Sequence, residues 1–170
     1  MESGPDNPWI IRRRPIAAVG HSRICRANPQ SDCRDLCFVT YECPDGLLWN
    51  HQTMVLPDHG QETLTCHVHG QLASARIGYG GKSFLRGGPK HFGGGSVEDL
   101  YKLGAARNIA TFYQSIVEQR FDNPTVQRAV DGTLTAILGR EAALRGVRLT
   151  MDELLRENRK LEVNLTGLKV

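Results

Sequence analysis

The first half of the chain carries the alternating pattern of β-strands. From Leu36 to Cys43 the sequence is rich in β-branched and aromatic residues, with Phe38 and Thr40 alternating against their neighbours. Pro44-Asp45-Gly46 follows, and the extended pattern resumes from Leu47 to Leu56. Two such stretches joined by Pro-Asp-Gly predict a β-hairpin.

Weaker patterns of the same kind predict strands on both sides of this hairpin. Before it, residues 16–25 indicate a first strand. After it, we expect strands over residues 62–69, 72–79 and 82–85, separated by glycine-containing turns.

The second half of the chain changes to helical spacing. Gly93-Gly94-Gly95 marks a flexible connection, and Ser96–Asp99 resembles a helix start, with a cap followed by early acids. Apolar residues then recur at helical spacing as far as Phe121. Asn123-Pro124 predicts the start of a second long helix, which Gly146 closes.

The last elements are short. Val147–Leu149 is predicted as an extended piece, and Thr150 and Glu153 have the spacing of a capping box, which opens a final helix. Strands therefore come first and helices second. This order indicates the α+β class, with a largely antiparallel open sheet and helices packed on one face, the helices mainly C-terminal.

The length of 170 residues fits one domain, which we assign to residues 15–170 after an irregular lead-in at 1–14. Strand and helix do not alternate repeatedly, so the sequence does not predict a dinucleotide-binding fold.

Composition and charge exclude several classes of protein. The formal net charge is +3, acids and bases are interspersed, and the basic cluster Arg12-Arg13-Arg14 is short, so nucleic-acid binding is not expected. No run of about 18 apolar residues occurs, and we expect no membrane span. Five cysteines at irregular spacing argue against a disulfide framework and favour reduced thiols in the cytoplasm.

Two phosphate-binding motifs are incomplete. Gly81-Lys82-Ser83 matches the end of a P-loop, but Arg76 stands where that loop needs its first glycine. Gly78 and Gly80 match the start of the dinucleotide fingerprint, but Ser83 stands at its third glycine position. The sequence therefore predicts no cofactor-binding residue.

The sequence gives little support for a metal site or a catalytic nucleophile. His67 and His69 would share one face of a strand, and with Cys66 they form a metal-binding hypothesis. No third ligand is evident nearby, so two surface histidines on a half-exposed strand are the favoured interpretation. No nucleophile motif is present, and we assign no catalytic residue and no metal ligand.

Several stretches resemble the oxidoreductase family named for glucose-fructose oxidoreductase, inositol dehydrogenase and MocA (Gfo/Idh/MocA), in its C-terminal, substrate-side domain. The resemblance rests on their order and spacing, and the stretches are Asp35–His51, Ala75–Gly87, Ala106–Phe112, Asn123–Gly146 and Leu149–Leu168.

The resemblance implies an NAD(P)-dependent enzyme acting on the CH–OH groups of a sugar or polyol. Complete relatives hold NAD or NADP in a preceding domain, where a Glu-Lys-Pro segment supplies the catalytic lysine and a later Asp-x-x-x-His pair handles the substrate hydroxyl. This sequence contains none of these features. We therefore expect a fragment or diverged remnant that binds no cofactor and is inactive as an isolated chain.

The resemblance also suggests substrate contacts and a partner. His59 and Gln61 lie in a loop that resembles the one overhanging the sugar, with an ordinary polar turn as the equal alternative. Arg107 and Asn108 lie near a helix start and could face the inter-domain cleft, although packing at that helix is the favoured role. The sheet of such domains commonly pairs with another subunit, so a homo-oligomer is expected. The alternative is a stand-alone, non-catalytic module for oligomerisation or sugar binding.

Overall fold

The computed structural model describes residues 11–25, 33–55, 64–78, 82–88, 91–94, 99–122 and 125–160. The chain divides into two compact units. One, the terminal unit, combines residues 2–56 with residues 130–170. The other, the inserted unit, holds residues 57–129 between them. Each unit is built around its own four-stranded sheet.

The sheet of the terminal unit, here the first sheet, is antiparallel throughout. Its strands stand in the order β3-β2-β1-β8. They are β1 (Ala17–Arg23), β2 (Leu36–Glu42), β3 (Leu48–Met54) and β8 (Leu149–Thr150). The register sets Ala18 opposite both Tyr41 and Leu149, so β1 joins the predicted hairpin to the C-terminal part of the chain.

The predicted β2–β3 hairpin is confirmed, and its turn follows from Gly46. The backbone N–H of Gly46 donates to the Cys43 carbonyl at 3.1 Å, and the N–H of Cys43 donates to the Leu47 carbonyl at 2.9 Å. Gly46 has a φ of 77°, a left-handed conformation that glycine adopts without steric cost.

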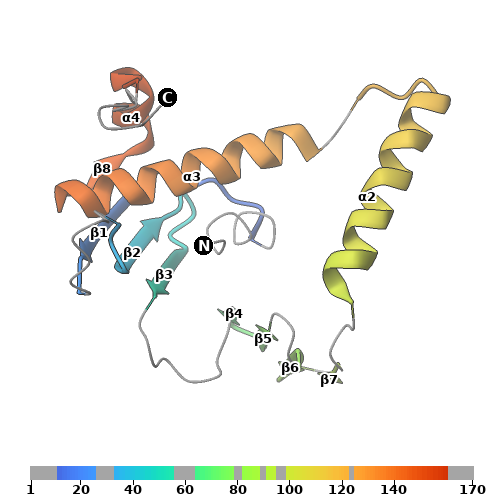
Figure 1. Ribbon diagram of the computed structural model, residues 1–170. Helices are drawn as coiled ribbons and strands as arrows, with labels where there is room; N and C mark the ends of the chain where they lie inside the picture. Colours follow the sequence, from blue (N-terminus) through green and yellow to red (C-terminus); the bar gives the residue numbers. More distant parts are fainter. Residues whose placement is uncertain are drawn as a thin grey trace. The chain divides into compact units, whose positions relative to one another are not determined.

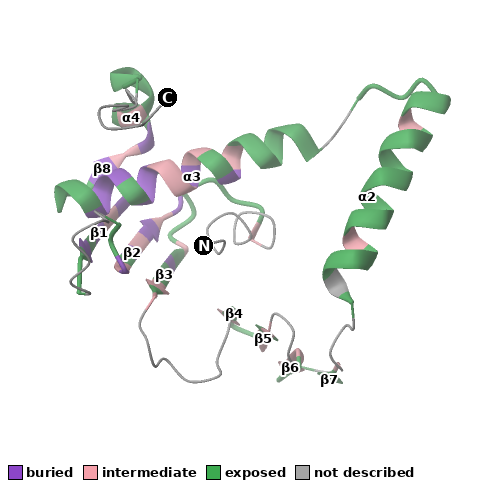
Figure 2. Ribbon diagram, viewed as in Figure 1, coloured by how far each residue is buried: buried purple, intermediate pink, exposed green. Residues whose placement is uncertain are grey.

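Helix α3 (Thr125–Arg145) lies along one face of the first sheet (Figure 1). The buried core forms between them, as the purple segments of Figure 2 show. Small residues on β1 let the helix come close: Ser22 donates its hydroxyl to the Ala143 carbonyl at 3.2 Å, and Ala18 is fully buried. From α3, Leu138 is fully buried against Tyr41 and Trp49 of the same cluster.

Helix α4 (Met151–Glu157) starts directly after β8 and has the predicted capping box. The Glu153 backbone N–H donates to Thr150 Oγ1 at 3.2 Å, and Glu153 Oε2 accepts from the Thr150 N–H at 2.8 Å. Gly146 ends α3 with a φ of 66°, as predicted.

A nearly buried carboxylate ties α3 to α4. Glu141, whose side chain is 10% exposed, accepts hydrogen bonds from Arg140 at 3.0 Å and from Arg145 at 3.1 Å. Arg145 also binds Glu157 of α4 at 2.7 Å. Desolvation would raise the pKa of Glu141, but the hydrogen bonds from Arg145 and Arg140 and their charges together lower it.

This network predicts an acid-sensitive contribution to stability. Because the folded-state pKa of Glu141 is lowered, its contribution is present above the unfolded-state pKa and is lost as pH falls through the folded-state pKa. Glu141→Gln should lower the free energy of unfolding by about 1 kcal/mol at pH 7, a modest value because both arginines are partly exposed. Urea unfolding at pH 7, 5 and 3.5 should show this difference shrinking; a difference independent of pH would contradict the prediction.

The inserted unit has a second antiparallel sheet in the order β4-β5-β6-β7. Its strands are β4 (Thr65–His69), β5 (Ser74–Gly78), β6 (Phe84–Arg86) and β7 (Phe92–Gly93). The first three confirm predicted strands. The sequence analysis missed β7, a two-residue strand beside a run of glycines, where neither alternation nor β-propensity gives a signal.

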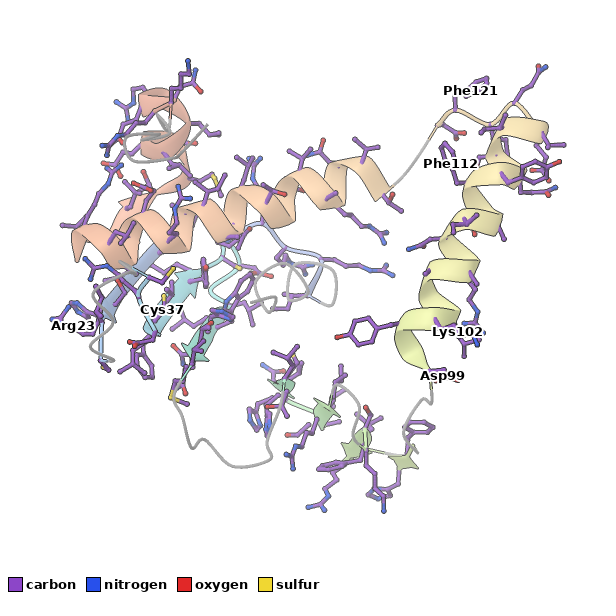
Figure 3. The ribbon with its side chains drawn as sticks, in the orientation of Figure 1. Arg23, Cys37, Asp99, Lys102, Phe112 and Phe121 are labelled. Carbon is purple, nitrogen blue, oxygen red and sulfur yellow. The ribbon has the colours of Figure 1, made fainter. Side chains whose placement is uncertain are left out.

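The long helix of the inserted unit, α2 (Leu100–Val117), starts differently from the prediction. Asp99 is its N-cap, with a φ of 51° and no side-chain capping bond, so Asp99 is not an acid of the first turn. Side chains project from α2 on all sides in Figure 3, where Lys102 and Phe112 are labelled. Phe112 is 69% exposed.

The α+β class, with antiparallel sheets and mainly C-terminal helices, is confirmed. None of the described helices is long and apolar enough to cross a membrane.

Candidate functional site

The first sheet has a second face, turned away from α3. Alternation along the strands places Val19, Thr40 and Asn50 in one row across β1, β2 and β3. The next row carries side chains of the same three strands, and its members are His21, Phe38 and Gln52. These six residues are called the open face below.

The open face is hollowed by a shallow depression of about 340 Å³. Besides the open-face residues, Gly20, Val39 and His51 line it. Thr40 donates its hydroxyl to Asn50 Oδ1 at 2.7 Å, and Phe38 is 41% exposed. None of the residues lining the depression is a carboxylic acid or a lysine. The surface therefore offers an aromatic ring, amide and hydroxyl groups and two imidazoles, with no carboxylate in the lining to orient a histidine for catalysis, and this set suits binding better than acid–base catalysis.

A charged pair stands at the edge of this face. Arg148 donates two hydrogen bonds to the Glu42 carboxylate, at 2.9 and 2.6 Å. The hydrogen bond from Arg148 lowers the pKa of Glu42, and the same bond raises the pKa of Arg148. The two charges compensate each other, so this edge adds little net field to the depression.

Two ionisable groups lie toward the core of the sheet. Burial lowers the pKa of His51, whose Nε2 is 2.8 Å from Thr53 Oγ1. Burial also raises the pKa of the Tyr41 phenol, and its ring lies 4.6 Å from that of Trp49. Both groups are consequently neutral near pH 7, and neither is placed as a general base.

The substrate-binding residues predicted from sequence are only partly described. Arg107 and Asn108 are exposed on α2, about two turns inside the helix, because the helix begins at Leu100. His59 and Gln61 lie outside the described residues. The four remain a prediction.

The structure removes Cys66 from the three residues of the metal-binding hypothesis. His67 and His69 share a face of β4, as predicted, with ring centroids 6.5 Å apart. Strand alternation turns Cys66 to the opposite face. Within the described ranges, no cluster of three or more histidine, cysteine, aspartate or glutamate side chains could hold a metal ion.

The open face itself was missed by the sequence analysis, which assigned none of its residues to a site. A signal was present in β3, where Asn50 and Gln52 alternate with Trp49 and His51. Such alternation marks a strand with one solvated face, but it does not say what that face binds.

Comparison with known sequences finds no match: no protein-family model matches the chain. A search of curated proteins likewise finds no similar sequence.

Comparison with solved structures does find similar folds. An oxidoreductase from Agrobacterium radiobacter, solved with NAD+, L-tartaric acid and magnesium, has a TM-score of 0.66 at 10% identity over 88% of this chain. The aldose-aldose oxidoreductase of Caulobacter crescentus, complexed with glycerol, has a TM-score of 0.67 at 14% identity over 87%. The myo-inositol 2-dehydrogenase of Lactobacillus plantarum has a TM-score of 0.61 at 14% identity over 85%.

This chain is shorter than those proteins. It covers 47%, 44% and 44% of their respective lengths. At such low identity the likeness establishes a shared fold. The chain thus shares the fold of somewhat less than half of each of these proteins.

Proposed function

We propose that this chain is the substrate-side half of an NAD(P)-dependent sugar or polyol oxidoreductase of the Gfo/Idh/MocA family. One observation carries the proposal. The structural similarity extends over 85–88% of this chain but over only 44–47% of each of the similar oxidoreductases. The sequence resemblance to the family's substrate-side domain supports the same assignment.

In this function the chain binds and orients the substrate. NAD or NADP supplies hydride chemistry, and the cofactor needs a glycine-rich phosphate-binding turn that this sequence does not contain. The side chains proposed to contact substrate hydroxyls are His59, Gln61, Arg107 and Asn108. A guanidinium, an imidazole and two amides together donate and accept hydrogen bonds, which matches the hydrogen-bonding character of a polyol.

Calorimetric titration with myo-inositol, glycerol and an aldose tests this function. We expect weak binding, with a dissociation constant on the order of millimolar, and a loss of about fivefold or more in Arg107→Ala and Asn108→Ala. Asn50→Ala, on the open face, is the matched control and should bind as the unaltered chain does. Absence of polyol binding would contradict the proposed function.

Cofactor titration separates the half-enzyme from a complete one. NADH fluorescence should show no binding at micromolar concentrations of the chain, because the sequence lacks the phosphate-binding turn. Enhancement of NADH fluorescence in that range would show that the chain holds its own cofactor, which would overturn the assignment as the substrate-side half.

A second function, self-association, is favoured by the open face. Its centre carries an aromatic ring and no carboxylate, lysine or arginine, while Arg23 and the Glu42–Arg148 pair stand toward its edges. An apolar or neutral centre with a charged rim is the usual anatomy of a protein interface. We infer that a second copy of this chain covers the open face, forming a symmetric dimer.

Light scattering after gel filtration tests the dimer. The unaltered chain should run as a dimer at about 100 μM, and Phe38→Asp should run as a monomer because it buries an unpaired charge at the centre of the interface. Phe121→Asp is the control, since Phe121 is 79% exposed outside the open face. A monomeric unaltered chain, or equal effects of both changes, would contradict the inference.

We infer the cellular compartment from the cysteine pattern. The five cysteines stand at irregular spacing and do not form the pattern of a disulfide framework, and reduced thiols persist where the medium is reducing. This supports the cytoplasm as the place where the chain acts.

A further inference from the structure

Two imidazoles on the inserted unit form an arrangement that the proposed function does not use. His67 and His69 stand on the same face of β4, both exposed, with ring centroids 6.5 Å apart and ring planes tilted by 41°. Their partners across the β4–β5 ladder are Arg76 and Ser74. We propose that His67 and His69 bind one divalent transition-metal ion, with Zn²⁺ and Cu²⁺ as the ions of matching chemistry.

The spacing of the rings fits a shared ion after a small adjustment. Imidazole nitrogen binds zinc at roughly 2.0–2.1 Å, so two rings on one ion have centroids roughly 5–6 Å apart. The observed separation of 6.5 Å is slightly larger. Both side chains are exposed, so small rotations about their side-chain bonds bring the two nitrogens to a common ion without displacing packed neighbours.

The surroundings of His69 are compatible with the tautomer that binds metal through Nε2. His69 Nδ1 lies 3.3 Å from Ser74 Oγ. When Nδ1–H donates to that oxygen, Nε2 keeps its lone pair for the ion. A hydrogen bond from the second ring nitrogen commonly orients metal-binding histidines and raises their basicity.

Arg76 sets the limit on affinity. It is opposite His67 in the register, and its positive charge opposes the charge of an arriving cation. With two protein ligands and this charge, the site is weak and open, and water completes the coordination. Imidazole ligands select zinc, copper or nickel over magnesium or calcium, and copper should bind tighter than zinc.

Calorimetric titration of the full chain with ZnCl₂ and CuCl₂ tests the site. We expect one ion per chain, with affinity reduced at least about tenfold in His67→Asn and in His69→Asn. His91→Asn is the matched control and should leave affinity unchanged, because His91 is an exposed histidine beside β7, at the other edge of the second sheet. Cys66→Ser should also leave it unchanged, because Cys66 is on the opposite face of β4.

Two further readouts separate this site from adventitious binding. Arg76→Gln should tighten binding several-fold by removing the repulsive charge. The electron paramagnetic resonance spectrum of the Cu²⁺ complex should show coupling to two imidazole nitrogens, falling to one in His69→Asn. Binding that is equally strong in His67→Asn and His91→Asn, or a spectrum that His69→Asn does not change, would overturn the proposal.

Discussion

Leu138→Ala should lower the free energy of unfolding by about 2–5 kcal/mol, because it removes a fully buried side chain from the core of the terminal unit. Leu138 is fully buried where α3 lies against the first sheet, among Tyr41 and Trp49. Removing the side chain forfeits its transfer free energy and leaves a cavity that the neighbouring rings cannot fill by small movements. Urea unfolding followed by circular dichroism measures the change.

Leu144→Ala is the matched control. Leu144 lies on the same helix, six residues further on, but is 45% exposed, so its truncation should cost less than about 1 kcal/mol. Equal losses in the two variants would show that α3 does not pack on the sheet as described.

The second large effect concerns the contact between Gly139 and Tyr41. A Cβ added at Gly139 would collide with the Tyr41 hydroxyl oxygen and would lie 2.7 Å from its Cζ. Tyr41 is only 4% exposed and its ring packs on Trp49, so it cannot swing away cheaply. Gly139→Ala should therefore lower the free energy of unfolding by about 1–3 kcal/mol, despite the better helix propensity of alanine.

Gly104→Ala is also a glycine-to-alanine change in a helix, but it should have the opposite effect on stability. A Cβ at Gly104 of α2 would meet no atom within 4 Å. Alanine should therefore raise the free energy of unfolding by about 0.5–1 kcal/mol at that position. In a Tyr41→Phe background, Gly139→Ala should lower the free energy of unfolding by a smaller amount, because the colliding hydroxyl oxygen is absent. An unchanged loss of stability would show that the collision with Tyr41 is not its cause.

Local chemistry explains why much of the fold could be predicted. Pro44-Asp45-Gly46 specifies the hairpin turn through the glycine, and Thr150 with Glu153 specifies the start of α4 through two reciprocal hydrogen bonds. Gly146 ends α3 for the same kind of reason. Each signal acts within a few residues, so it survives in the sequence without knowledge of the tertiary structure.

The features that escaped prediction depend on distant neighbours. Gly139 looks like a weak point in a helix until Tyr41, far away in sequence, is placed against it. The depression on the open face likewise needs three strands brought into register.

The predicted substrate contacts did not come from local sequence chemistry. Arg107 and Asn108 came from a resemblance rather than from spacing or charge, and a helix surface alone does not say which of its polar side chains meets a ligand. The histidine pair, in contrast, could be placed from the sequence pattern alone. Alternation along one strand was enough to place His67 and His69 on one face, whereas Cys66, which the sequence analysis kept in the metal hypothesis, lies on the opposite face.

The pairing of Ala18 with Leu149 has a consequence for the order in which the protein is made. β1 leaves the ribosome before its neighbour β8, and residues 24–148 are made between the two strands, so one edge of β1 stays unpaired while that whole stretch is synthesised. A chain that stopped at Gly146 would keep that edge unpaired permanently. Since unpaired edges pair with strands of other molecules, termination before β8 should yield aggregates rather than a slightly smaller protein.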